Sequence, residues 1–210
     1  DNELTTVTRA DTTTVKSGYD ADGNLTSQTD ANNAVTAYAY DQLNRVKSTT
    51  DPLNRVTSLT YDGAGNRLTM VDPASQTTTW AYDPANENTA ITYSDNKTPN
   101  VTNITYSPDG QRTAMTDGTG TSAWTYDSLN RLTKYTNGAG AVVSYGYDIK
   151  GQVTSITYPN GKTVTDTYDP AGHLSSVGDW LSHTTNFGYD PNGNLTNEAY
   201  PNTTNAASTY

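Results

Sequence analysis

A tyrosine followed by an aspartate recurs along the whole chain at a nearly constant spacing. The interval is 21 residues in most copies, with one interval of 24 and one of 20 near the middle. Self-similarity at such a period is typical of repeat proteins, in which each copy is one supersecondary unit. We call the tyrosines of this phase the anchor tyrosines; they are Tyr19, Tyr40, Tyr61, Tyr82, Tyr106, Tyr126, Tyr147, Tyr168, Tyr189 and Tyr210.

The residues after each anchor predict a turn, which we call the tyrosine turn. Its first residue is Asp in every copy except Ser107, and Pro follows in several copies. Asp accepts backbone N–H groups, Pro presets φ, and Gly or Asn tolerates positive φ, a combination typical of a type I turn ending in a bulge. The residues expected at positive φ are Gly23, Asn44, Gly65, Asn86, Gly110, Asn130, Gly151, Gly172 and Gly193.

A second turn begins about eleven residues after each anchor, as in Asp51-Pro52-Leu53-Asn54. Two short strands therefore fit into each repeat. Residues 95–100, in the 24-residue copy, are expected to form a longer loop. Leu or Val stands six residues after most anchors, but this apolar position slips near Asn66, Glu87 and Gln111, where we expect a local bulge.

The strand entering each anchor alternates, so the anchor shares a face with the residue two before it. We therefore expect the anchors to pack as a ladder along the sheet, next to a row of mostly apolar partners. This row contains Tyr38, Leu59, Trp80, Ile104, Trp124, Tyr145 and Phe187, with Ser17, Asp166 and Ser208 in the other copies.

Composition agrees with a polar all-β chain. Leu, Val, Ile and Phe together make up only 28 of the 210 residues, too few for a helical bundle or a large aliphatic core, whereas there are 40 Thr and 16 Tyr, which favour strands. The pattern predicts about twenty strands in one long antiparallel sheet. Because open twisted sheets rarely exceed about ten strands without curling, the sheet should curl into a spiral or shell.

Few residues suggest chemistry. The chain has no cysteine, which excludes disulfides and thiolate metal sites. Its net charge is −10, which makes nucleic acid an unfavourable partner. His173 and His183 lack the paired spacing of a zinc site. The periodic aspartates fit either a calcium ladder or turn caps, and caps also explain the Gly or Asn three residues later. We expect no catalytic residue, no metal and no cofactor, and hence no enzyme.

The repeat resembles the YD repeat of the Rhs family, whose pattern runs Y-D-x-x-G-N/R-L-T. Near-consensus copies are Tyr19-Asp20-Ala21-Asp22-Gly23-Asn24-Leu25-Thr26, Tyr40-Asp41-Gln42-Leu43-Asn44-Arg45-Val46 and residues 189–196. Members of this family include bacterial Rhs proteins, the C component of toxin complexes, wall-associated proteins and teneurins. The resemblance implies a hollow β-shell that encloses a C-terminal toxin domain. Asp169-Pro170-Ala171-Gly172 superficially resembles the family's self-cleavage motif, but it stands in the ordinary turn phase.

Residues 1–210 are thus predicted to be a non-catalytic YD-repeat segment, about ten repeats long, of a larger Rhs-type shell. The resemblance implies a secreted or cell-surface bacterial protein without a membrane span, whose partners are the rest of its shell and the enclosed toxin. Unpaired sheet edges also suggest self-association into open filaments. The alternative is an extracellular adhesion or glycan-binding module, although choline-binding repeats would need more tryptophan per copy.

Overall fold

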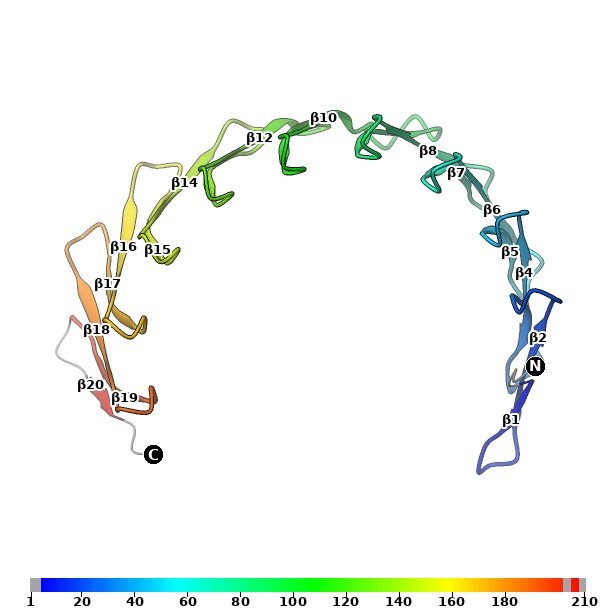
Figure 1. Cartoon of the computed structure of the whole chain (residues 1–210), viewed down its shortest axis with the longest axis horizontal. Helices are drawn as coiled ribbons and strands as arrows, with labels where there is room; N and C mark the ends of the chain where they lie inside the picture. Colours follow the sequence, from blue (N-terminus) through cyan, green and yellow to red (C-terminus); the bar gives the residue numbers. More distant parts are fainter. Residues whose placement is uncertain (1–4, 202–204, 208–210) are drawn as a thin grey trace. The chain divides into compact units, whose positions relative to one another are not determined.

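The computed structural model describes residues 5–201 and 205–207 of the chain. These residues form twenty β-strands that follow one another within each sheet in chain order, so the topology is an antiparallel meander (Figure 1). The all-β fold class predicted from the repeat is confirmed. The predicted anchor Tyr210 and its row partner Ser208 lie outside the described residues.

The strands belong to two sheets, one of nine and one of eleven strands. The first sheet contains β1 (Thr6–Thr8), β2 (Thr14–Tyr19), β3 (Leu25–Thr29), β4 (Val35–Tyr40), β5 (Val46–Thr50), β6 (Val56–Tyr61), β7 (Arg67–Val71), β8 (Thr77–Tyr82) and β9 (Asn88–Tyr93). The second contains β10 (Thr102–Tyr106), β11 (Arg112–Asp117), β12 (Gly120–Tyr126), β13 (Leu132–Thr136), β14 (Val142–Tyr147), β15 (Val153–Thr157), β16 (Thr163–Tyr168), β17 (Leu174–Gly178), β18 (Thr184–Tyr189), β19 (Leu195–Ala199) and β20 (Asn205–Ala207).

The division into two sheets differs from the single long sheet expected from the sequence. The expected longer loop forms after β9, where the Asp95 carboxylate accepts the N–H groups of Lys97 and Thr98. Beyond this loop, Ile91 and Val101 form only an isolated bridge, so the regular ladder ends at β9. The chain accordingly divides into two compact units, one ending at Ile104 and the other beginning at Thr105.

The 20-residue repeat has the opposite cause, a shortened second turn. Asp117 pairs directly with Gly120, which leaves a two-residue loop between β11 and β12. Gly120 has a φ of 116°, and a Cβ at this position would lie 2.2 Å from the Gly138 carbonyl oxygen of the next second turn. Glycine is therefore required there both by the backbone and by the neighbouring turn.

The hairpins that carry the anchors contain a register shift at the anchor. In β14–β15, Gly146 pairs with Ser155 while Tyr147 pairs with Val153, so Thr154 is the extra residue of a bulge. The same shift recurs in the other anchor hairpins whose register is defined. A bulge is thus a regular feature of the repeat and not a local feature of the copies near Asn66 and Glu87.

Alternation along the strands gives each sheet two chemically different faces. The anchor face carries the anchor tyrosines and their row partners; in β14–β15, for example, Tyr145 pairs with Ile156. The opposite face, which we call the hydroxyl face, carries mainly Thr, Ser, Ala and Gly. There the Thr60 and Thr69 hydroxyls lie 2.6 Å apart across two strands. Such pairs stabilise neighbouring strands without an apolar core.

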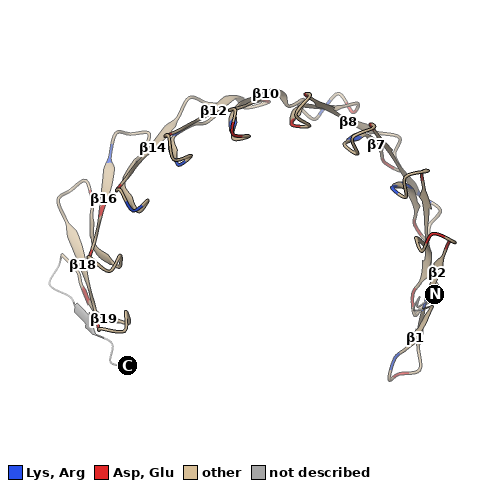
Figure 2. Cartoon of the chain, viewed as in Figure 1, with Lys and Arg blue, Asp and Glu red and all other residues tan. Residues whose placement is uncertain are grey.

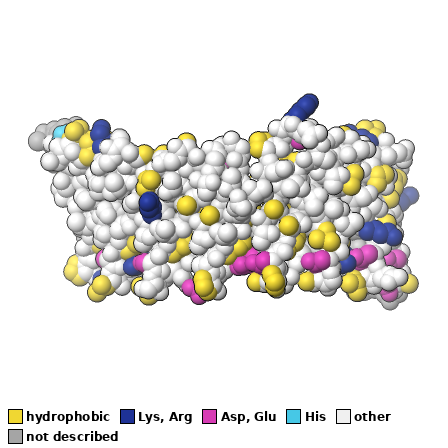
Figure 3. All heavy atoms as spheres, turned by 90° about the horizontal axis from the view of Figure 1, so that it is seen from above, with side chains coloured by type: hydrophobic (Ala, Val, Ile, Leu, Met, Phe, Trp, Pro, Cys, Tyr) yellow, Lys and Arg dark blue, Asp and Glu magenta, His cyan; other side chains and the backbone are white. Residues whose placement is uncertain are grey.

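Both sheets are single layers. Of the described residues only Ile104 and Ser122 are buried, at 6% and 5% exposure. The accessible surface is 13,314 Å², whereas a compact protein of this mass exposes about 9,500 Å². On the face seen in Figure 3, hydrophobic side chains are scattered among polar ones. The fold is therefore held by strand ladders and turns rather than by a central core.

The turns lie at the two ends of the strands in each sheet. The tyrosine turns lie at one end and the second turns at the other, as a meander requires (Figure 1). Charged residues lie mostly in these turns (Figure 2). The described residues contain no helix long and apolar enough to cross a membrane. Most charged side chains of each repeat are therefore found at the ends of its strands.

Candidate functional site

The tyrosine turn is built by the aspartate that follows the anchor. In the copy after Tyr19, the Gly23 N–H donates to the Asp20 carbonyl at 3.1 Å. The Asp20 carboxylate accepts the N–H groups of Asp22 and Asn24 at 3.0 and 2.8 Å. Equivalent bonds recur in the other copies, and in the exceptional copy the Ser107 hydroxyl accepts the Gln111 N–H at 3.2 Å. The aspartates are therefore turn caps, as one of the two sequence interpretations predicted.

All nine Gly and Asn residues predicted at positive φ have values between 57° and 96°. The second turns use the same geometry, with positive φ at Asn33, Asn54, Gly140 and Gly161. Ser75 and Ser182 also adopt positive φ there, at 62° and 65°. The sequence did not reveal these two serines because serine carries no preference for the left-handed region.

Hydrogen bonds inside the turn lower the pKa of most capping aspartates. The Arg45 side chain, followed by the Arg45 N–H, holds the pKa of Asp41 below its ordinary value. At Asp169 the side-chain bond from His173 acts in the same way. These carboxylates are stabilised as anions, which is the state needed for a cap.

The anchor tyrosines connect successive repeats through their hydroxyl groups. In seven copies the hydroxyl donates to the carbonyl of the first residue of the preceding leaving strand, 14 or 15 positions earlier, at 2.8–3.1 Å. The pairs are Tyr40–Leu25, Tyr61–Val46, Tyr82–Arg67, Tyr126–Arg112, Tyr147–Leu132, Tyr168–Val153 and Tyr189–Leu174. The anchor side chain thus reaches across to the neighbouring strand, which belongs to the previous repeat.

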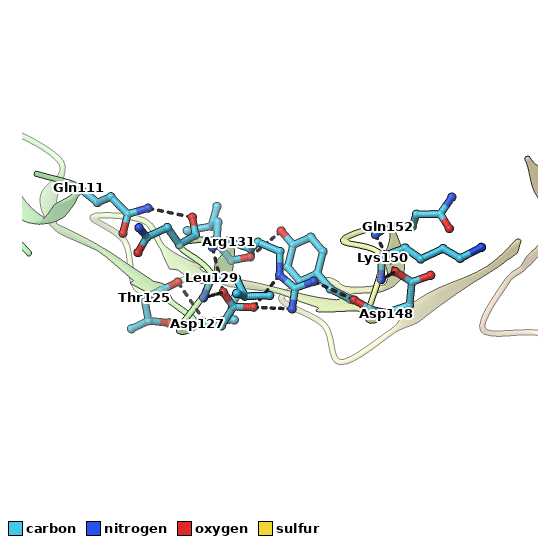
Figure 4. A network of polar contacts seen from close by, with 12 residues as sticks. Gln111, Thr125, Asp127, Leu129, Arg131, Asp148, Lys150 and Gln152 are labelled. Atoms are coloured by element: carbon cyan, nitrogen blue, oxygen red, sulfur yellow. Dashed lines mark hydrogen bonds and ion pairs between the residues drawn. The ribbon is translucent and has the colours of Figure 1, made fainter. Parts of the chain in front are cut away.

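A second connection comes from the residue directly after the Gly or Asn of the tyrosine turn. Arg131 binds the Asp127 carboxylate within its own turn at 2.7 Å and donates to the Asp148 carbonyl of the next turn at 2.8 Å (Figure 4). Its guanidinium lies 4.6 Å from the ring centroid of Tyr147. Arg45 makes the same three contacts with Asp41, Asp62 and Tyr61. One side chain therefore joins two turns and covers an anchor.

Other residues at this position also reach the next turn. Gln111 donates to the Asn130 carbonyl (Figure 4) and Gln152 to the Gly172 carbonyl, both at 2.8 Å. His173 stacks on the Tyr189 ring with centroids 4.7 Å apart. We call this series the turn row; its described members with a contact to the next repeat are Asn24, Arg45, Asn66, Gln111, Arg131, Gln152 and His173.

The structure differs from the predicted ladder of tyrosines, because anchor rings contact turn-row side chains. Tyr61, Tyr147 and Tyr189 each contact a turn-row side chain, and described anchors other than Tyr106 make no ring contact with one another. The reason is distance, because anchors of adjacent repeats are two strands apart, or about 9.5 Å. Turn-row side chains therefore lie between the anchor rings, an arrangement that we call the interleaved ladder.

The row two residues before the anchors packs mainly across strands. Trp124 pairs with Tyr135, with ring centroids 5.4 Å apart. In two of the three copies where the apolar position after the anchor slips, arginine replaces it and covers the next tryptophan: Arg67 lies 4.0 Å from the Trp80 ring centroid, and Arg112 lies 4.8 Å from that of Trp124. In the third copy, this position is Asn88. The slip thus reflects a change of packing partner.

Asp166 is the exception in this row. It lies opposite Val177 on the anchor face, and burial raises its pKa. Burial and the charges of Asp166 and Asp148 also raise the pKa of Tyr168. Within residues 5–201, no three His, Cys, Asp or Glu side chains group as metal ligands. His173 and His183 each bind the aspartate of their own turn, at 2.9 and 3.0 Å.

Tandem hairpins whose contacts recur from one copy to the next define a single-layer β-repeat protein. Comparison with protein families identifies which one. The RHS Repeat family matches residues 19–53, 40–77, 61–98 and 168–204, and the Teneurin YD-shell family matches residues 81–179. The RHS Repeat matches cover more than half of the chain, and the chain belongs to this family. The resemblance noted from the sequence is confirmed.

Solved structures share the fold. The chain is similar to the crystal structure of TcdB2-TccC3-Cdc42, with 20% identity and a TM-score of 0.62, and to the Photorhabdus luminescens Tc holotoxin pore, with the same values. TcdB2-TccC3 without its hypervariable C-terminal region matches at 16% identity and a TM-score of 0.55. These matches cover 91–92% of this chain but 12–15% of the other chains. A comparison with curated protein sequences gives no match.

Proposed function

We propose that this chain is one segment of the wall of a larger Rhs-type β-shell, and that the shell encloses a C-terminal toxin domain and helps to deliver it. The observation that supports this proposal most directly is the single-layer sheet with two unlike faces, neither of which is covered by a second layer. A wall needs this arrangement, because one face borders the interior and the other borders solvent.

The role is structural and not catalytic. The polar and ionisable side chains of the turn row and the anchors, such as Arg131, Tyr147 and His173, make contacts between repeats. The chain spans 12–15% of the Tc chains that it matches, so its partners in this proposal are the remaining shell and the enclosed domain. The parent protein would be secreted or displayed on a bacterial surface, as the resemblance to toxin-complex proteins suggests.

The test uses the full-length protein that carries this chain. Tyr147→Ala combined with Tyr168→Ala removes two adjacent anchors and their hydroxyl links to Leu132 and Val153. We expect an added protease to digest the enclosed domain in this variant and to leave it intact in the wild type. Tyr158→Phe, which alters a 41% exposed tyrosine outside the anchor series, is the matched control.

Electron microscopy of the wild-type protein provides the second readout. A closed shell with density inside it, weakened in the double variant and unchanged in the control, is the expected result. Equal digestion of the C-terminal domain in wild type and double variant, with that domain outside the sheet, would overturn the proposal.

A further inference from the structure

The second turns of the last repeats form a shallow pocket that the wall function does not use. Its volume is about 420 Å³ and it lies between two neighbouring hairpins of the same unit. One hairpin supplies the turn that starts at Tyr158, and the next supplies Trp180. The lining residues are Tyr158, Pro159, Asn160, Lys162 and Trp180.

The turn that starts at Tyr158 differs from the second turns that begin with an aspartate. In those turns the aspartate caps the turn; Asp51, for example, accepts the Arg55 N–H at 3.0 Å. Asp51 also neutralises the Arg55 side chain, at 2.6 Å. Tyr158 takes the position of Asp51, and Lys162 takes the position of Arg55.

Lys162 therefore lacks the carboxylate that pairs with Arg55 and His183 at the equivalent positions. No ion pair to it forms within residues 5–201, and its ammonium group lies 4.7 Å from the ring centroid of Trp180. Tyr158 cannot supply the side-chain cap, and the Asn160 Oδ1 accepts the Lys162 N–H in its place. A local departure from the structural optimum is typical of functional positions.

The geometry of the two rings favours a flat apolar group. Tyr158 and Trp180 are 41% and 45% exposed, and their rings lie 6.5 Å apart at 79° to one another. Asn160 uses its Oδ1 to accept the Lys162 N–H at 3.1 Å, so its amide N–H groups remain available as donors. The pocket therefore offers ring faces, an amide donor and an unpaired cation within a few ångströms.

We propose that this pocket binds a uronic acid unit of an acidic glycan. The apolar face of the pyranose ring packs on Tyr158 and Trp180, the sugar carboxylate replaces the missing turn aspartate beside Lys162, and a ring oxygen accepts from Asn160. Charge complementarity supports this ligand, because a ring and a carboxylate occur together in one unit. A quaternary ammonium ligand, the usual occupant of an aromatic cage, is disfavoured by Lys162.

The proposed site recognises a single carboxylate, the one beside Lys162. The adjacent pocket, formed by His183, Thr185, Tyr200 and Pro201, is acidic in its surroundings. There Asp179 binds His183 at 3.0 Å, and Glu198 accepts a hydrogen bond from Tyr200 and raises its pKa. These surroundings do not favour a second uronate, so a longer polyuronate should bind through one unit, at Lys162.

Titration calorimetry with three probes tests the proposal at physiological ionic strength. Tetragalacturonate carries both the ring and the carboxylate, its methyl ester keeps the ring without the charge, and tetraglutamate keeps the carboxylates without the ring. We expect tetragalacturonate to bind and the other two to bind at least about tenfold more weakly. Equal binding of all three, tighter binding of tetraglutamate, or no binding of tetragalacturonate would overturn the proposal.

Variants distinguish binding from folding. Lys162→Gln should weaken tetragalacturonate binding about tenfold. Tyr158→Asp restores the usual turn acid and pairs it with Lys162, so binding should fall by at least as much while the unfolding midpoint stays equal or rises. Arg55→Gln, at the equivalent position of another second turn, should leave binding unchanged. Wild-type affinity in Tyr158→Asp, or an equal loss in Arg55→Gln, would contradict the assignment of the site.

Discussion

Replacing Tyr147 by phenylalanine tests whether the anchor hydroxyls hold neighbouring repeats together. The change removes the hydrogen bond to the Leu132 carbonyl, 2.8 Å long, and keeps the ring against Arg131. Because a hydrogen bond of this kind contributes about 0.5–1.5 kcal/mol net, we expect the free energy of unfolding to fall by about 1 kcal/mol. Equilibrium denaturation followed by circular dichroism measures this difference.

Tyr147→Ala removes the ring as well. The lost contacts are the Arg131 guanidinium, 4.6 Å from the ring centroid, and the cross-strand neighbour Val153. The Arg131 contact contributes roughly 0.5–1 kcal/mol and the Val153 contact roughly 0.2–1 kcal/mol. Together with the lost hydrogen bond, they should lower the free energy of unfolding by about 2–3 kcal/mol. Combining Tyr147→Ala with Arg131→Ala in a double-mutant cycle isolates the cation–π part, for which we expect a coupling of about 0.5–1 kcal/mol.

Tyr158→Phe is the control, because Tyr158 is 41% exposed and is not an anchor; its cost should stay within about 0.5 kcal/mol. A Tyr147→Phe protein as stable as the wild type, within experimental error, would refute the reasoning that the hydroxyl links carry contacts between repeats. Zero coupling between Tyr147 and Arg131 would refute the interleaved ladder in particular.

Four further predictions concern the turns and the anchor face. Gly151→Val should lower the free energy of unfolding by more than about 1 kcal/mol, since φ is 88° there. Ser182→Gly, at a φ of 65°, should raise it by about 0.5–1 kcal/mol. Asp166→Val should stabilise the fold most at neutral pH, and the gain should shrink as the pH falls through the raised pKa of Asp166 towards about pH 4, because burial raises the pKa of Asp166. The Arg45 bonds lower the pKa of Asp41, so the stability lost on acidification, starting near pH 4 and continuing below it, should be smaller in Asp41→Asn. Denaturation curves across pH measure the last two.

Local chemistry explains why the turns could be predicted from the sequence. A tyrosine turn such as Asp148-Ile149-Lys150-Gly151 is specified within four residues, because the cap and the positive φ each depend on one side chain. The strands follow, since little else fits between two such turns. The loop before Val101 was predicted from the 24-residue interval, but its consequence for the sheet was not. A ladder continues only where the next strand returns in register.

Contacts between repeats were less accessible to sequence reasoning. Alternation shows that Tyr147 and Tyr145 share a face, but it does not give the register between β13 and β14, in which Lys134 pairs with Ser144. That register determines that the Tyr147 hydroxyl reaches Leu132 and that Arg131 lies on the ring. The periodic signal of the turn row is also weak, because Arg, Gln, Asn and His all make the connection by different atoms.

The tyrosine turns and the second turns have different roles, and this difference explains how one repeat can acquire a binding site and keep its fold. Backbone ladders and tyrosine turns hold the sheet together, and the tyrosine turns lie at the opposite ends of the strands from the second turns. A change at a second turn, such as tyrosine in place of aspartate at position 158, where Asn160 supplies the cap, therefore leaves the contacts of Tyr147, Tyr168 and Arg131 in place. In a protein whose described residues include only two buried side chains, substitution at this edge creates no cavity. New recognition surfaces should therefore arise preferentially at the second turns, where the exposed pair Tyr158 and Trp180 lies.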